Sequence, residues 1–286
     1  MRSVEMRSGL LCALPIVCIL VAGFLMPLLV VAGFSTMPQK TFSLWQLPDF
    51  SSYWVLLQHG YYKSLLWSLF LALATVVVLF LLCYPLAFAM ARVFRKFTLV
   101  ITIGVVMSLF VSENIRLFGW NLTLMKGGLF EGYWRAWSGT GFDGLLYNVP
   151  VIVFGLVYVY IPFMLFPLAQ SISMIPEDMR QAAADLGASN WRILWEIDLP
   201  LAAPGIVVGS LLSFVLATGA LAESKLLGGQ VVIVMADEVE TAFTYGQNWP
   251  LGSALTVVMV SIIAGLAIFG ISRIDLDRIM GRRRAS

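Results

Sequence analysis

Six long apolar runs, separated by polar segments, dominate the pattern of hydrophobic and polar positions along the chain. A bilayer core about 30 Å thick needs roughly 20 apolar helical residues, and shorter runs suffice when neighbouring helices or flanking side chains help. The pattern therefore predicts an all-α membrane protein with six transmembrane helices. Their approximate positions are 10–34, 65–91, 97–120, 149–170, 205–222 and 251–271.

The Lys and Arg residues are divided unevenly between the two sides that six spans create. Twelve of the 18 lie in segments on the side of the termini, which also holds the loop 171–204. Because cytoplasmic loops carry the excess of Lys and Arg, we expect a multi-pass protein of the bacterial cytoplasmic (inner) membrane with both termini cytoplasmic. We treat 1–286 as a single transmembrane domain. Its parts are a first span with an outer aromatic loop (1–60), a core (61–275) that contains the loop 171–204, and a basic cytoplasmic tail (276–286).

Composition excludes a soluble domain. Hydrophobic residues make up 60% of the chain, charged residues 12%, and the mean hydropathy is +0.90, whereas charged residues alone form about a quarter of a soluble domain. The formal net charge of only +2 gives no basic field that would indicate nucleic acid as a partner. Most of the surface must therefore face lipid.

The loop 171–204 is polar and has the pattern of two short helices. Residues 176–186 predict an Ala-rich helix with two acids near the positive end of its dipole. Gly187 permits a sharp turn, and Ser189 or Asn190 can cap a second helix, which we expect Pro200 to end before the fifth span. On this pattern alone, an amphipathic hairpin on the membrane surface with no partner is an alternative.

The same loop carries a family signature. The run 181–187 (Gln-Ala-Ala-Ala-Asp-Leu-Gly) is followed after nine residues by 197–200 (Ile-Asp-Leu-Pro). This spacing resembles the Glu-Ala-Ala, Gly, Ile-x-Leu-Pro motif of membrane subunits of binding-protein-dependent ABC importers. The resemblance implies a type I ABC importer permease fold, with the loop docked in a cleft of an ATPase subunit. The implied coupling residues are Gln181, Ala182, Ala183, Asp185, Gly187, Ile197, Leu199 and Pro200.

One residue departs from the signature, and other runs narrow the resemblance. Gln181 stands where the family usually has glutamate, which removes one expected charge contact but keeps hydrogen-bonding capacity. The segments 112–120, 226–229 (Leu-Leu-Gly-Gly) and 248–254 (Asn-Trp-Pro-Leu-Gly-Ser-Ala) are similar to those of spermidine/putrescine permeases. Glu223, Ser224 and Lys225 depart from that subfamily's mostly uncharged, proline-containing pattern.

Ionisable residues at membrane depth are functional candidates because they require a cavity or a partner. Glu113 and Arg116 are the clearest, and their i, i+3 spacing also permits a local ion pair. The segment 223–240 has a local charge of −3; it could concentrate cations, dock a basic face of a delivery protein, or be a solvated loop. The residues we expect along a substrate path are Glu113, Asn114, Arg116, Trp120, Tyr160, Glu223 and Trp249.

The chain contains no Gly-x-x-x-x-Gly-Lys-Ser/Thr phosphate loop, which ATP hydrolysis of that type requires. We therefore expect no enzyme, no metal site and no cofactor in this chain, with ATP and Mg bound by partner subunits. The resemblance implies two ATP-binding subunits, a second permease subunit that is often a different chain, and a periplasmic or lipid-anchored solute-binding protein. The single His59 lies in an aromatic outer loop and cannot assemble a metal site with scattered acids.

The predicted function is ATP-driven import of a small cationic metabolite, polyamine-like, by alternating access. A different substrate such as an amino-acid derivative fits the same class. An ion-gradient-driven secondary transporter would show related halves with broken helices at matching positions, which the sequence lacks. A membrane-embedded enzyme would require acids, His or Cys clustered at one depth, and these are absent from the pattern as well.

Overall fold

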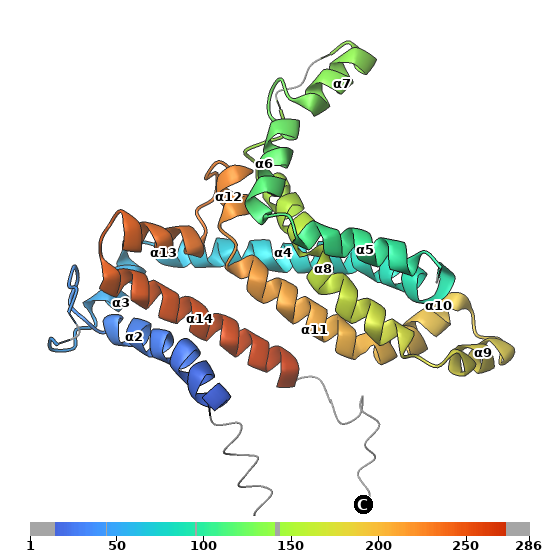
Figure 1. Ribbon diagram of the computed structural model, residues 1–286, viewed down its shortest axis with the longest axis horizontal. Coiled ribbons are helices and arrows are strands. Elements are labelled where there is room, and N and C mark those ends of the chain that lie inside the picture. Colours follow the sequence, from blue (N-terminus) through green and yellow to red (C-terminus); the bar gives the residue numbers. More distant parts are fainter. Residues whose placement is uncertain (1–14, 44, 95, 141–143, 273–286) are drawn as a thin grey trace, which may run out of the picture. The chain divides into compact units, whose positions relative to one another are not determined.

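A computed structural model describes residues 15–43, 45–94, 96–140 and 144–272 as an all-helical chain (Figure 1). Contacts divide the protein into two compact units. The first combines Met1–Lys63 with Asp237–Ile262, and the second combines Ser64–Ala236 with Ile263–Ser286.

The first unit contains the amino-terminal span and an aromatic cluster. The span Pro15–Phe34 ends in η1 (Val21–Leu25) and α2 (Met26–Phe34), and α3 (Ser51–Gln58) follows in the next loop. Trp249, at the start of α14 (Trp249–Ser272), lies edge-on to Phe34 and Phe42, each with ring centroids 5.6 Å away. The helix α13 (Met235–Thr244) supplies Phe243, whose ring centroid lies 6.3 Å from that of Trp249.

The second unit is built around α8 (Val149–Ser173), which carries six of the twelve largest fully buried side chains of the described residues and packs along α11 (Leu199–Thr218). Asn148 begins α8 by accepting a hydrogen bond from Val151 N at 3.0 Å. The other elements of this unit are α4 (Tyr61–Phe88), η2 (Ala89–Val93), α5 (Thr98–Leu109), α6 (Glu113–Leu124), α7 (Leu129–Ser138), α9 (Glu177–Asp185), α10 (Asn190–Ile193), η3 (Leu194–Asp198) and α12 (Ala222–Leu226).

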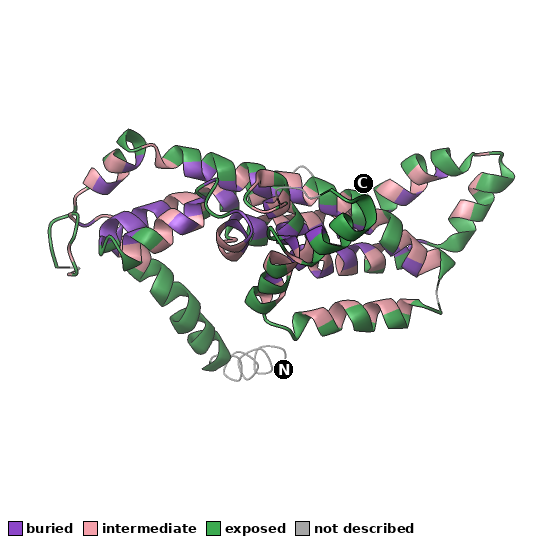
Figure 2. Ribbon diagram, turned by 90° about the horizontal axis from the view of Figure 1, so that it is seen from above, coloured by how far each residue is buried: buried purple, intermediate pink, exposed green. Residues whose placement is uncertain are grey.

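Large apolar side chains are exposed along most helices, and Figure 2 shows exposed and buried positions alternating along them. Such surface is stable only in a hydrocarbon solvent, because a soluble protein rarely exposes large contiguous apolar patches. Within the described residues, five helices are long and apolar enough to cross a membrane, and the candidate spans number six when one bent pair of helices is taken as a single span. The predicted all-α fold with six spans is confirmed.

Two expectations about the spans are wrong in detail. The third is not one helix, because Thr98–Leu109 and Glu113–Ser138 meet at 96°; Ser112 between them has an extended backbone, with ψ 136°. The fifth does not begin after a break at Pro200, since the helix runs through from Asn190 to Thr218. Pro200 is tolerated because the preceding turn is a π-helix, in which Leu199 N donates to Leu194 O, so α-type bonding is already interrupted there.

Candidate functional site

A buried carboxylate with no cation paired to it lies where α6, α8 and α12 meet. Glu223, on α12, is completely buried and forms no ion pair among the described residues; the Tyr160 hydroxyl is close enough to act on the carboxylate, although neither oxygen has a hydrogen bond of good geometry. Its Cγ would lie 3.5 Å from a Cβ added to Gly155 of α8, so the side chain runs along the glycine face of that helix. A buried, unpaired carboxylate is costly, and this marks Glu223 as the centre of a candidate site.

Three other predicted path residues surround Glu223. Glu113 and Arg116 on α6 both act on its charge, and so does the nearly buried Tyr160 on α8. We call Glu113, Arg116, Tyr160 and Glu223 the carboxylate cluster. The pKa of Glu223 is raised from 4.5 to about 7, chiefly by burial and then by the nearby charge of Glu113, while a backbone hydrogen bond, the Tyr160 hydroxyl and the charge of Arg116 lower it. Glu223 lies outside the candidate spans.

Arg116 does not form the ion pair with Glu113 that their spacing permits. No bridge within 4.0 Å joins them in the described part of the chain, and the Nε and Nη1 atoms of Arg116 are buried without partners there. Its guanidinium lies over the ring of Tyr158, 5.6 Å from the centroid. The cluster therefore holds two carboxylates and one guanidinium at close range without direct pairing.

Aromatic side chains form one wall beside the cluster. Trp120 meets Phe154 edge-on with ring centroids 4.7 Å apart and Tyr158 with centroids 5.6 Å apart. Asn121 ties this helix to α12 by donating a 2.5 Å hydrogen bond to Leu226 O. Aromatic faces attract cations, so the wall and the carboxylates suit the same kind of ligand.

Two path predictions are not among the contacts of the cluster. Asn114 is exposed on α6, on the same helix as Glu113. Trp249 belongs to the first unit, within its aromatic cluster. The structure thus brings Glu113, Arg116, Trp120, Tyr160 and Glu223 into one region of the second unit.

The polar loop forms the predicted helical hairpin. Its first helix, α9, has no buried residue, and Gly187 (φ +81°) makes the bend. Ser189, rather than Asn190, caps the second helix by accepting from Arg192 N at 3.4 Å. Of the predicted coupling residues, Gln181, Ala182, Asp185, Gly187 and Pro200 are exposed, and Ala183, Ile197 and Leu199 are half-buried.

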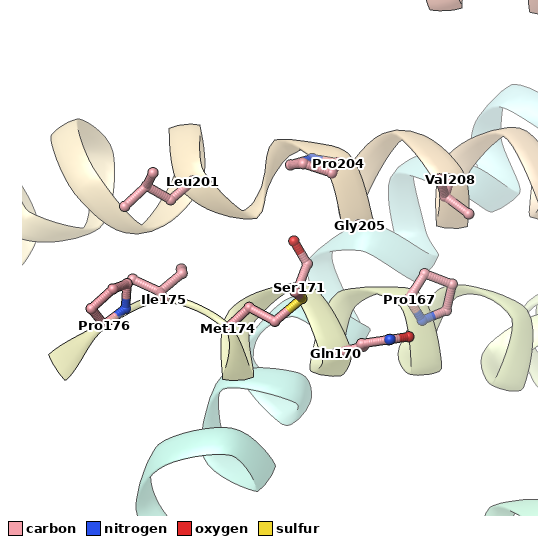
Figure 3. A pocket seen from close by; sticks show the side chains of 10 residues that line it. All are labelled: Pro167, Gln170, Ser171, Met174, Ile175, Pro176, Leu201, Pro204, Gly205 and Val208. Atoms are coloured by element: carbon pink, nitrogen blue, oxygen red, sulfur yellow. The ribbon is translucent and has the colours of Figure 1, made fainter. Parts of the chain in front are cut away.

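A groove of about 550 Å³ lies between α8 and α11 next to the start of this hairpin. Figure 3 shows its lining on the facing sides of the two helices: Pro167, Gln170, Ser171, Met174, Ile175, Pro176, Leu201, Pro204, Gly205 and Val208. The helices cross closely here, because a Cβ on Gly205 would lie 2.4 Å from Pro167 O, and Ser171 Oγ donates to Ala202 O at 3.3 Å. None of the lining residues is ionisable, so the groove offers a surface for apolar packing and no charged group for binding or catalysis.

Sequence reasoning missed a set of buried charges behind the hairpin. Arg180 of α9 lies 3.1 Å from Asp198, and Arg92 of η2 pairs with Glu177 of α9. We call these four residues the four-charge network. The one available signal was Asp198, an acid between Ile197 and Leu199 at the edge of an apolar run. Among the described residues, no group of three His, Cys, Asp or Glu side chains could hold a metal ion.

Comparison with known proteins gives the chain its relatives. No protein-family model matches it. The spermidine/putrescine transport system permease protein PotB of Escherichia coli K12 is 30% identical over 219 residues, which is 76% of this chain and 79% of the relative. PotB of Haemophilus influenzae is 28% identical over 247 residues, which is 86% of this chain and 86% of the relative. The inner membrane ABC transporter permease YdcU of E. coli K12 is 28% identical over 250 residues, which is 81% of this chain and 78% of the relative.

Among solved structures, a bacterial ABC transporter involved in the import of the acidic polysaccharide alginate matches with a TM-score of 0.72 at 16% identity, over the whole of both chains. At that identity the likeness concerns the fold.

The helical spans and these matches define a membrane-spanning permease subunit of an ABC transporter, a multi-pass protein of the bacterial inner membrane that works in a complex with other subunits. Within that class, the chain belongs to the family of the spermidine/putrescine permease PotB.

Proposed function

We infer that this permease carries a small organic cation, polyamine-like, across the membrane by alternating access. The observation that carries the inference is Glu223, a fully buried carboxylate with no ion pair among the described residues, set beside a second carboxylate and an aromatic wall. An ammonium group would satisfy Glu223 directly, because it donates hydrogen bonds and neutralises charge at once. The names of the PotB relatives, spermidine/putrescine transport proteins, support the same substrate class.

In our proposal, other chains hydrolyse the ATP that drives this transport. Two ATPase subunits bind ATP and Mg and contact the hairpin through Gln181, Ala182, Ala183, Asp185, Gly187, Ile197, Leu199 and Pro200. The exposure of α9 supports this role, because none of its residues is buried and all but Arg180 and Ala183 are exposed, which leaves most of the helix surface open to a partner. Gln181 contributes a hydrogen bond in place of a charge.

The rest of the assembly follows from the same scheme. A second permease subunit completes the pore, and a periplasmic or lipid-anchored binding protein delivers the solute. The excess of Lys and Arg on the side of the termini supports cytoplasmic termini and a cytoplasmic hairpin. The proposed path residues are Glu113, Asn114, Arg116, Trp120, Tyr160, Glu223 and Trp249. The geometry described above supports five of them, all except Asn114 and Trp249.

The test is uptake by the complete complex in proteoliposomes, with ATP inside and the binding protein outside. We expect uptake of spermidine or putrescine that requires ATP. Uptake of an amino-acid derivative instead would overturn the substrate class, and ion-driven uptake by this chain alone would overturn the ABC mechanism.

The role of the cluster is tested by Glu223→Gln with Glu131→Gln as its matched control. Glu131 is also a buried acid, but it is fully engaged by Arg135 at 3.1 Å and by Gly127 N at 2.7 Å. A charge contact to the moving substrate is worth about 1.5–3 kcal/mol, so we expect Glu223→Gln to reduce uptake about tenfold or more at unchanged assembly. Equal effects of the two substitutions would remove the cluster from the path.

A further inference from the structure

The first helix of the hairpin is attached to the membrane spans by charges rather than by packing. No residue of α9 is buried, and a cavity of about 710 Å³ separates it from α4 and η3. The lining of this cavity includes Tyr84, Phe88, Arg92, Glu177, Arg180 and Asp198. The ion pairs across the cavity are therefore the direct links between α9 and these elements.

One ion pair closes the open end of the hairpin. Arg180 Nε lies 3.1 Å from Asp198 Oδ1, and the side chains are only 19% and 2% exposed. The Arg180 guanidinium also lies over the Phe88 ring of α4, 5.0 Å from its centroid. At the other end, the backbone turns at Gly187. The two helices are thus joined at both ends, whereas a glycine bend alone would leave them free to open.

A second ion pair ties α9 to two further elements. Arg92 of η2 pairs with Glu177 and also donates to Ile175 O and, at 3.4 Å, to Ile172 O at the end of α8. Its side chain is 14% exposed. The charges of Arg92 and Glu177 also act on Asp198, so the four groups form one network. Because Glu177 is 49% exposed, this pair is the less buried of the two, and the Arg180–Asp198 pair is the one more sensitive to loss of a partner.

The helix that contains Asp198 continues into the fifth span without a break. The run from Asn190 to Thr218 is helical throughout, including Pro200. A displacement of the hairpin is therefore passed directly to α11, which packs along the central helix α8.

From this geometry we propose that the four-charge network transmits motion from the hairpin to the spans, with Arg180 and Asp198 as its central positioning residues. The pair makes the hairpin and the start of α11 move as one body, so that a pull on α9 tilts the span instead of opening the bend at Gly187. This inference rests on the proposed ATP-driven function and adds how the force leaves the hairpin.

The test uses the reconstituted complex and measures solute taken up per ATP hydrolysed, together with assembly by co-purification of the ATPase subunits. The main variant is Arg180→Gln with Asp198→Asn, which removes both charges and leaves no unpaired ion. Coupling free energies between sites are typically about 1–3 kcal/mol, so we expect uptake per ATP to fall at least about fivefold while assembly and ATP hydrolysis persist. A merely structural role would lower uptake and hydrolysis together and leave their ratio unchanged.

Two further variants sharpen the result. Arg180→Lys keeps a cation opposite Asp198, so we expect it to take up more solute per ATP hydrolysed than the double variant does. Arg192→Gln with Glu196→Gln is the matched control, because it neutralises an exposed ion pair of the same hairpin, with Nε and Oε1 2.9 Å apart, whose two residues lie within the one continuous helix Asn190–Thr218. We expect this control to take up as much solute per ATP hydrolysed as the native chain does.

A native ratio in the double variant, or an equal loss in the control, overturns the inference. If the double variant does not assemble, Glu177→Gln decides: its side chain is 49% exposed, so folding should tolerate it, and an unchanged ratio would again reject the network. Failure of the native complex to couple solute to ATP at all would instead reject the proposed function.

Discussion

The second unit holds two groups of buried charges that are built in opposite ways. In the four-charge network, each cation faces an acid, as Arg180 faces Asp198 at 3.1 Å. In the carboxylate cluster, the buried Glu223 and the half-buried Arg116 lie near each other without an ion pair among the described residues. Both groups contain buried polar atoms without a hydrogen bond, including Asp198 Oδ2 in the network, but only the network brings opposite charges into direct ion pairs.

The difference teaches what each group is for. Paired buried charges add geometric specificity, since the partners must stay opposite each other to avoid a large penalty. Unpaired buried charges raise the free energy of the empty site, and an incoming ion of the right sign relieves it. We therefore expect the network to respond to mutation as a structural joint and the cluster to respond as a binding site.

The largest expected effect is on the network. Asp198→Asn leaves Arg180 facing a neutral side chain, and removal of one partner from a buried ion pair costs about 3–5 kcal/mol. Unfolding of the purified chain in mixed detergent micelles measures this as a shift of the transition midpoint. The variant with both Arg180→Gln and Asp198→Asn should recover most of the lost stability, because it contains no unpaired charge. A double variant no more stable than Asp198→Asn would show that the pair is not the source of the loss.

The sequence predicted the spans and the hairpin for a simple physical reason: both depend on local patterns. Apolar runs fix where helices cross lipid, and Gly187 was correctly expected to make the bend, with φ +81° in the structure. The break at Ser112 was missed because the apolar residues of 97–111 and 117–120 were joined into one span across the polar residues Glu113, Asn114 and Arg116. The end predicted at Pro200 was wrong because a π-helical turn accommodates the proline.

The charged sites were predictable only one residue at a time. Glu113, Arg116 and Glu223 could each be named as candidates, because an ionisable residue in apolar surroundings is conspicuous. Whether Arg116 pairs with Glu113 depends on side-chain directions that spacing does not determine, and the structure has the guanidinium over Tyr158 instead. Arg180 and Asp198 come together only through the fold of the hairpin, so no local pattern pairs them.

The next effect concerns the pH dependence of the cluster. Burial, helped by Glu113, raises the pKa of Glu223 from 4.5 to about 7. The folded chain therefore keeps a proton that the unfolded chain loses, and this contribution to stability is complete below about pH 4.5 and lost as pH rises through 7. At about 1.4 kcal/mol per pH unit, the native chain should lose up to about 3 kcal/mol between pH 5 and 8.

Glu223→Gln should be free of that loss, which denaturation at pH 5 and pH 8 measures directly. Spermidine should stabilise the native chain at pH 8 and leave the Gln variant unchanged, because a ligand stabilises only the state that it binds. Identical pH profiles for both chains would show that Glu223 does not cause the loss of stability, and would contradict its role as a buried carboxylate with a raised pKa.

A smaller effect is expected at the helix crossing beside the hairpin. Gly205→Ala places a Cβ 2.4 Å from Pro167 O and 2.4 Å from Ser171 Cβ, and overpacking of this kind costs about 1–3 kcal/mol. Gly104→Ala on α5 is the control, since nothing lies within 4 Å of its new Cβ and alanine favours a helix by about 0.5–1 kcal/mol over glycine. Thermal unfolding of the two variants should therefore move in opposite directions, and a parallel shift would contradict the close contact of α8 and α11.

The smallest effect is expected for the exposed pair of the hairpin. Arg192 Nε donates to Glu196 Oε1 at 2.9 Å, but the two side chains are 66% and 61% exposed. Such i, i+4 pairs contribute about 0.3–0.5 kcal/mol because water and salt screen them. Arg192→Gln with Glu196→Gln should therefore shift the unfolding midpoint by far less than Asp198→Asn does, and the shift should vanish in high salt. If this variant lost as much stability as Asp198→Asn does, burial would not distinguish the network from an ordinary surface ion pair. The contrast between the two groups of charges could then no longer be explained by how they are paired.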